Sequence, residues 1–213
     1  GIMLNSDLNW KEWTELYKKI VYWELEIDRS PDKSMLEIVR MQKLEANNSF
    51  FKFIEKNYVN WLNGKDKNAP VMSHNLVRTK LIPELDKNSS VFFILIDNLR
   101  YDQWKIIQPL ISDMYKTETE DLYYSILPTA TQYARNALFA GLLPTEIQRR
   151  FPDKWLNDED EGLKNQFEEF FMQEQLKRQN MDIKMSYNKI TNHAAGKRLA
   201  ENISNLMQNK LNV

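Results

Sequence analysis

The feature that most constrains the fold is an apolar run that ends abruptly on a carboxylate. Residues 91–96 are Val-Phe-Phe-Ile-Leu-Ile, and Asp97 follows them directly. Six aliphatic and aromatic residues in a row predict a strand that is buried on both faces, as in a parallel sheet. Ligands of open α/β sheets bind at the carboxyl ends of such strands, so Asp97 is a candidate ligand for a divalent cation. From its position alone, Asp97 could equally cap the helix predicted to start near Tyr101.

A second informative segment follows a strand predicted over residues 121–127. Thr129 and Thr131 precede a helix that is predicted to end at Gly141, a residue type that commonly terminates helices. A hydroxyl at a helix N-terminus lies beside free backbone N–H groups and the positive end of the helix dipole, which favour a bound anion. Taken alone, either threonine could simply be the N-cap of this helix.

Together, the segments 96–102 and 128–141 resemble the start of the PglZ-domain branch of the alkaline phosphatase superfamily. In that superfamily a strand-end Asp binds a metal, and a Thr or Ser in a Pro-x-x-Thr turn is the nucleophile. Alignment on the Pro-x-x-Thr spacing implies that Thr131, rather than Thr129, is the nucleophile. The resemblance therefore implies that Asp97 and Thr131 are metal ligands and that Thr131 is catalytic.

The same resemblance implies a zinc-dependent phosphodiesterase with two zinc ions in the complete domain. Its expected substrate is a phosphodiester, such as an oligonucleotide or a cyclic nucleotide. Some proteins of this branch are two-component response regulators that control protein secretion, in which a receiver domain and a helical bundle precede the PglZ domain. A receiver domain is therefore an expected partner, and homodimerisation is left open. The alternative is a non-catalytic regulatory or dimerisation module that keeps the fold without the activity.

Three further residues are candidates for binding substrate. Arg135 follows Thr131 by four positions, which places both on one face of a helix, and a guanidinium can hold a phosphate through two hydrogen bonds. Asn136 and Asn98 could donate to a phosphate oxygen from neighbouring positions. The competing interpretation of Arg135 is an ordinary surface arginine.

The composition excludes several other classes of protein. The 213 residues carry a net charge of -1, from 29 basic and 30 acidic side chains, and no basic cluster occurs along the sequence, which disfavours nucleic-acid binding by charge. There is no cysteine, so disulfides and thiolate chemistry are excluded. No apolar run is long enough to cross a bilayer, so a cytoplasmic location is expected.

The two histidines, His74 and His193, are too few for a site with two metals. In the superfamily the remaining ligands come from later Asp-x-x-x-His and His motifs. We therefore expect an N-terminal portion of the PglZ domain that is inactive alone, because ligands are missing. An acidic stretch at residues 157–161 could bind a cation, although a solvated loop is the commoner structure for such a sequence.

The expected fold class is α/β. Residues 1–87 predict a three-helix bundle, with helices starting at Asn9, Ser30-Pro31 and Ser73, and with a weak point at residues 45–49. Residues 88–213 predict alternating strands and helices, hence a mostly parallel sheet. The expected strands are residues 90–97, 119–127, 182–187 and a start at 211–213, and the expected helices are residues 101–115, 131–140, 144–150, 163–177 and 192–208.

Overall fold

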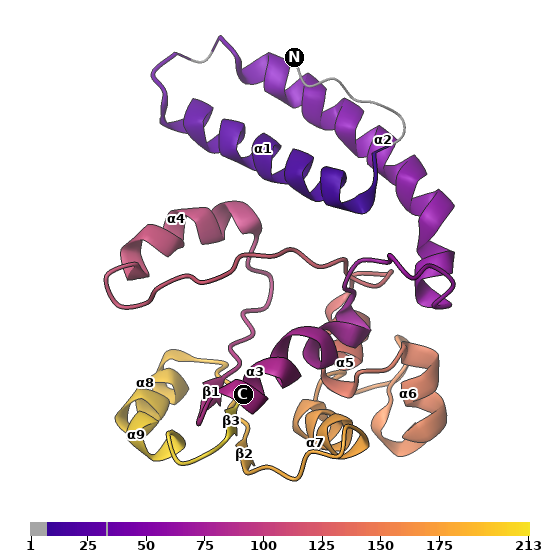
Figure 1. Cartoon of the computed structure of the whole chain (residues 1–213), viewed down its shortest axis with the longest axis vertical. Helices are drawn as coiled ribbons and strands as arrows, with labels where there is room; N and C mark the ends of the chain where they lie inside the picture. Colours follow the sequence, from indigo (N-terminus) through magenta and orange to yellow (C-terminus); the bar gives the residue numbers. More distant parts are fainter. Residues whose placement is uncertain (1–7, 33) are drawn as a thin grey trace. The chain divides into compact units, whose positions relative to one another are not determined.

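The computed structural model describes residues 8–32 and 34–213, which fold into two compact units (Figure 1). The first unit comprises the residues up to Pro70 together with Asn98–Leu122. The second comprises Val71–Asp97 and Tyr123–Val213. The chain therefore passes between the units three times, which differs from a single boundary after residue 87.

Helix α1 (Trp10–Arg29) begins where the sequence predicts, because Asn9 forms a complete capping box. The Asn9 Oδ1 accepts hydrogen bonds from the backbone N–H groups of Lys11 and Glu12, and the Glu12 carboxylate accepts one from the Asn9 N–H at 2.7 Å. The apolar face of α1 packs on α2 (Leu36–Leu62). The core of this unit consists of Trp13, Leu16, Ile20 and Ala46, with Leu8, Phe50 and Phe53 against it.

The predicted start of the second helix at Pro31 is wrong, since α2 begins five residues later. The Ser30 hydroxyl accepts from the Asp32 N–H, and the Asp32 carboxylate accepts from the Ser34 N–H at 2.8 Å. These local side-chain bonds stabilise a turn instead of a helical start. Helix α2 is continuous through residues 45–49, and Gly64 follows its end with a φ of 63°.

The third predicted helix does not join the N-terminal core. Its segment consists of a 3₁₀ turn, a π-helical turn (Val77–Leu81) and α3 (Ile82–Lys87), with Pro83 in the first turn of α3. A proline has no N–H and disturbs the preceding turn, so the change of helix type falls where Pro83 requires it. Val77, Leu81 and Leu85 are buried in the core of the second unit.

The second unit contains a parallel sheet of three strands among the described residues, in the order β1-β3-β2. Each strand is only two residues long: β1 (Val91–Phe92), β2 (Met185–Ser186) and β3 (Leu211–Asn212). All pairing is parallel, which confirms the expected α/β class and sheet type. The helices of this unit are α5 (Thr131–Ala140), α6 (Pro144–Arg150), α7 (Glu168–Arg178), α8 (His193–Glu201) and α9 (Ile203–Leu206), and α4 (Tyr101–Ile111) belongs to the first unit.

Two strand predictions need correction. The run at residues 91–96 is not buried on both faces, and its paired part, β1, lies at an edge of the sheet with β3 on one side. Phe93 and Leu95 pack on the core, whereas Ile94 and Ile96 are 76% and 60% exposed. The segment predicted as a strand at residues 119–127 forms a single bridge, between Tyr124 and Met72.

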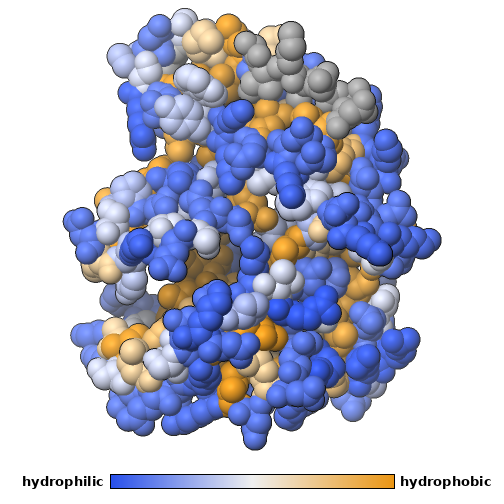
Figure 2. Space-filling view, in the orientation of Figure 1, coloured by the Kyte–Doolittle hydropathy of each residue, from blue (hydrophilic) through white to orange (hydrophobic). Residues whose placement is uncertain are grey.

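The surface carries apolar side chains as well as charged ones. Figure 2 shows hydrophobic residues among hydrophilic ones in the region of α1 and α2. On these helices Tyr22, Trp23, Met41 and Phe51 are each more than half exposed. None of the helices in the described ranges combines the length and the hydropathy needed to cross a bilayer.

The contact between α5 and α7 depends on Gly141. This residue ends α5 in the left-handed conformation, with a φ of 60°, as the sequence predicts. The buried Gln175 side chain of α7 lies against it and donates to the carbonyls of Leu138 and Phe139 at 3.0 and 2.8 Å. A Cβ at position 141 would overlap the Gln175 amide.

We predict that Gly141→Ala lowers the free energy of unfolding by about 3 kcal/mol, from backbone strain plus the clash with Gln175. Gly64→Ala is the matched control, because its φ is 63° and no atom lies within 4 Å of the added Cβ. It should cost about 1 kcal/mol, from strain alone. Urea denaturation of both variants tests this, and equal losses would show that the Gln175 contact contributes nothing.

Candidate active site

Asp97 stands at the end of the apolar run, beyond the paired residues of β1. Its side chain is 46% exposed, and its Oδ2 accepts a hydrogen bond from the Arg135 guanidinium at 3.0 Å. Arg135 belongs to α5, so this ion pair joins the end of the strand segment to the helix that follows the Pro-x-x-Thr turn. The alternative role of Asp97, as the cap of the following helix, is not observed among the described residues, because the N-cap of α4 is Arg100.

Thr131 is the first residue of α5 and its side chain is exposed. The N-cap is Ala130, so neither Thr131 nor Thr129 caps this helix. One helical turn separates Thr131 from Arg135, and residues four apart lie about 6 Å from each other on one face. The contact between α5 and the Asp97 carboxylate is therefore made by Arg135, four positions after Thr131.

A buried carboxylate that sequence reasoning missed lies behind Arg135. Glu168, the first residue of α7, has a side chain that is 1% exposed. Its Oε1 lies 2.6 Å from Arg135 Nη2, so the two groups form an ion pair. This contact does not have the geometry of a hydrogen bond. Its Oε2 accepts from the Lys189 ammonium at 2.8 Å and from the Tyr187 hydroxyl at 2.7 Å. The single negative charge of Glu168 is thus shared between two cations from different segments.

This network holds the Arg135 guanidinium in place. Its two terminal nitrogens contact Asp97 and Glu168, while its Nε is buried without a hydrogen-bond partner among the described residues. Burial raises the pKa of Tyr187, and the hydrogen bond to Glu168 raises it further. Tyr187 therefore stays a neutral donor to the carboxylate.

The predicted substrate ligands differ in what their side chains contact. Asn136 is buried; its amide donates to the Lys164 carbonyl at 3.1 Å, and its Oδ1 accepts from Asn165 at 3.2 Å. Its side chain is thus engaged in holding the segment before α7. Asn98 is exposed and adopts a φ of 60°, a conformation that Asn tolerates better than most residues. Arg100 and Asp102 pair with each other through two hydrogen bonds.

The described residues do not assemble a metal site. Among them, no three His, Cys, Asp or Glu side chains lie close enough together to hold an ion. Asp97 already faces the positive charge of Arg135, which disfavours a second cation there. His74 is half-buried, its pKa is lowered by desolvation, and it lies in the 3₁₀ turn; His193 is exposed at the start of α8. A zinc site at Asp97 requires additional donors.

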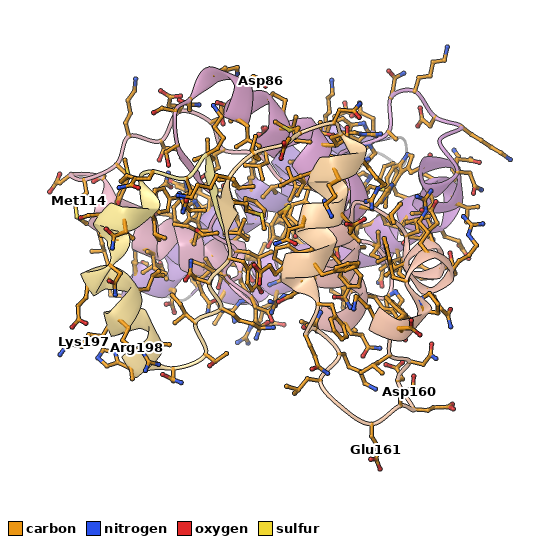
Figure 3. All side chains as sticks on the ribbon, turned by 90° about the horizontal axis from the view of Figure 1, so that it is seen from below. Asp86, Met114, Asp160, Glu161, Lys197 and Arg198 are labelled. Carbon is orange, nitrogen blue, oxygen red and sulfur yellow. The ribbon has the colours of Figure 1, made fainter. Side chains whose placement is uncertain are left out.

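The acidic stretch at residues 157–161 is a loop on the surface. Asp160 and Glu161 lie at its outer end and point away from the ribbon (Figure 3). Asp158 instead attaches the loop to α5, because it accepts hydrogen bonds from Gln132 and from the Tyr133 hydroxyl. The bonds of this loop fit a structural role close to the first turn of α5.

A pocket of about 620 Å³ lies along the same segment of the second unit. Its only charged lining residues among those described are Asp97, Arg135 and Lys189. Most of its wall is apolar: Phe92, Phe93, Ile94, Leu95, Ile96, Phe139, Ile190, Leu199, Ile203, Leu206 and Val213. The pocket thus combines an apolar wall with a pair of cations and one carboxylate.

Two family models match this chain. Residues 1–62 match the model of the PorX response regulator linker domain. Residues 76–213, more than half of the chain, match the model of the BREX system PglZ alkaline phosphatase-like domain. No curated protein sequence matches the chain.

We predict that Glu168→Gln lowers the free energy of unfolding by about 3 kcal/mol, because Arg135 and Lys189 would lose the buried carboxylate that they share. Glu169→Gln is the matched control: it is the next residue of α7 and is exposed, so its effect should stay within about 0.5 kcal/mol. Chemical denaturation of both variants checks this. Equal stabilities for the two variants would contradict the role assigned to Glu168.

Proposed function

This chain belongs to the PglZ alkaline phosphatase-like family, and from that premise we propose that it supplies the nucleophile of a phosphoester hydrolase. In this proposal Thr131 is the nucleophile and Asp97 the carboxylate of the site. The N-terminal match to a response-regulator linker domain supports a phosphatase-like module linked to two-component signalling. Control of protein secretion, which the resemblance implies, is the proposed output.

The observation that carries this proposal is the ion pair between Asp97 and Arg135. It joins the two segments that resemble the family, which are separated by more than thirty residues in the sequence. A shared site requires Thr131 and Asp97 to lie at one rim, and the contact of Asp97 with Arg135, one helical turn from Thr131, supports such a site. Two segments on opposite sides of the sheet could not form this pair.

In the proposed reaction the Thr131 hydroxyl oxygen forms a bond to phosphorus, and the bond to the leaving alcohol breaks. Water then cleaves the bond between phosphorus and the Thr131 oxygen, which restores the hydroxyl and releases a phosphate monoester. A threonine hydroxyl must lose its proton to act, which requires a base or a bound cation. Zinc is the cofactor that the resemblance implies, but the described residues lack the donors for it, so we assign no step to zinc.

Arg135 is the proposed phosphate ligand. Its guanidinium lies one turn from Thr131 and can stabilise charge on the phosphoryl oxygens. Binding a phosphate through Nη1 would require the Asp97 carboxylate to turn away, since Asp97 occupies that nitrogen. The apolar wall of the neighbouring pocket suits an organic ester, such as a nucleotide phosphodiester, better than inorganic phosphate.

A non-catalytic regulatory or dimerisation module is the second candidate. Two observations favour it: the Asp97 carboxylate is paired with an arginine, and large apolar side chains of α1 and α2 are exposed. Exposed apolar side chains are typical of surfaces that contact another protein. Sedimentation analysis showing a stable dimer, together with absent hydrolysis, would support this candidate over the enzyme.

We predict that Thr131→Ala abolishes hydrolysis of a chromogenic phosphodiester, because it removes the attacking oxygen. The loss expected for a nucleophile is at least about 10³-fold in kcat. Thr131→Ser should keep measurable activity, since it retains a hydroxyl. Thr129→Ala is the matched control and should leave the rate within about threefold, because Thr129 lies outside α5 in this proposal.

The assay should use the longest natural form of the protein that carries residues 1–213, with and without added zinc. Equal losses in Thr131→Ala and Thr129→Ala would remove Thr131 as the nucleophile. Activity that survives Thr131→Ala would do the same. No hydrolysis in any form would instead favour the regulatory module.

A further inference from the structure

The pocket that contains Asp97 and Arg135 holds a second cation, Lys189, which the reaction proposed above does not use. Lys189 lies in the segment between β2 and α8, whereas Arg135 belongs to α5. All three charged residues are part of the second unit. Two cations from distant parts of the sequence therefore line one pocket, together with a single carboxylate.

A buried carboxylate fixes the two cations close to each other. Glu168 Oε1 lies 2.6 Å from Arg135 Nη2, and Glu168 Oε2 accepts a hydrogen bond from Lys189 Nζ at 2.8 Å. Guanidinium and ammonium groups bind phosphoryl oxygens at similar distances to carboxylate oxygens. Because the two nitrogens are held by the two oxygens of one carboxylate, they are near enough to each other for one phosphoryl group to contact both.

The Lys189 ammonium has more donors than the acceptors that it contacts. An ammonium group carries three N–H donors. Among the described residues two acceptors receive them, the Glu168 carboxylate and the backbone carbonyl of Asn165 at 2.7 Å. The Lys189 side chain is 40% exposed, so its third donor is accessible to a ligand in the pocket.

The charges around the pocket favour one bound anion. Glu168 supplies one negative charge to two cations, and Asp97 balances the other through its ion pair with Arg135 at 3.0 Å. Asp97 is 46% exposed and Glu168 is 1% exposed, so Asp97 is the carboxylate that can turn toward solvent. A phosphoryl group with a single negative charge would then take the place of Asp97 and keep the cluster neutral.

We propose that Lys189 binds the phosphoryl group of the ester together with Arg135, as the second phosphate ligand of this pocket. The inference rests on the proposed function, because it takes the ligand of this site to be a phosphoester. A purely structural Lys189, which only neutralises Glu168, would be indifferent to the charge of the ligand. The two roles therefore differ in a measurable property.

The test is calorimetric titration with two ligands that differ in charge: bis(4-nitrophenyl) phosphate, an anionic diester, and its neutral methyl triester. It uses the longest natural form that carries residues 1–213, with Thr131→Ala to prevent turnover. Lys189→Met should weaken binding of the diester at least about tenfold, through loss of a charge-assisted contact, and leave binding of the triester unchanged. Lys184→Met is the matched control: Lys184 is exposed and does not line the pocket, so the change should stay below about twofold.

Three outcomes would overturn the proposal. The first is a diester that binds no more tightly than the triester when Lys189 is present. The second is equal weakening of both ligands by Lys189→Met, which would show a structural role. The third is equal weakening of the diester by Lys189→Met and Lys184→Met, which would show unspecific attraction to charge.

A second measurement needs no substitution at Lys189, whose removal takes a partner from the buried Glu168. A saturating concentration of the diester should slow acetylation of Lys189 by acetic anhydride and leave that of Lys184 unchanged, as followed by mass spectrometry. Equal rates at Lys189 with and without the diester would also overturn the proposal.

Failure of this inference is distinguishable from failure of the proposed hydrolase. Hydrolysis of the diester that depends on Thr131, combined with binding that does not depend on Lys189, would refute only the second phosphate ligand. Binding that depends on Lys189, without hydrolysis by the protein that retains Thr131, would refute the nucleophile and support the phosphate ligand.

Discussion

The second unit depends on one buried carboxylate. Glu168 is almost fully removed from water, and it is stable there because a guanidinium, an ammonium and a tyrosine hydroxyl surround it. A single buried charge would be strongly unfavourable, whereas a paired and hydrogen-bonded one is tolerated. The three partners come from α5 and from the segment after β2, so the cluster ties α7 to both.

This buried cluster also sets the chemistry at the surface. Arg135 cannot move freely, because one of its terminal nitrogens is held by Glu168. Its other terminal nitrogen therefore reaches Asp97, at the end of the apolar run. The contact between Arg135 and Asp97 thus follows from charges placed in the interior. The buried Glu168 carboxylate therefore helps to position the charged side chains of the candidate site.

Several features were predictable from the sequence because their causes are local. The capping box of Asn9, the end of α5 at Gly141 and the start of α6 at Pro144 each depend on a few neighbouring residues. Local reasoning failed where tertiary partners decide. The run at residues 91–96 alternates between core and solvent because the core of the second unit covers only one of its faces. Residues 121–127 could form a strand only beside a neighbouring strand. Among the described residues, only Tyr124 of this segment has such a partner, which is Met72.

By itself the sequence determined the fold class, most helices and the pair of segments that identify the family, because helix caps, turn residues and motif spacing act over short distances. Only the tertiary structure decided that Arg135 contacts Asp97, that Glu168 is buried, and that Lys189 shares a carboxylate and a pocket with Arg135. Glu168 looks like any acidic residue near a helix start, and Lys189 looks like any lysine of a nearly neutral chain. Their charges acquire meaning only when folding brings distant segments within a few ångströms, where Coulomb interactions become strong.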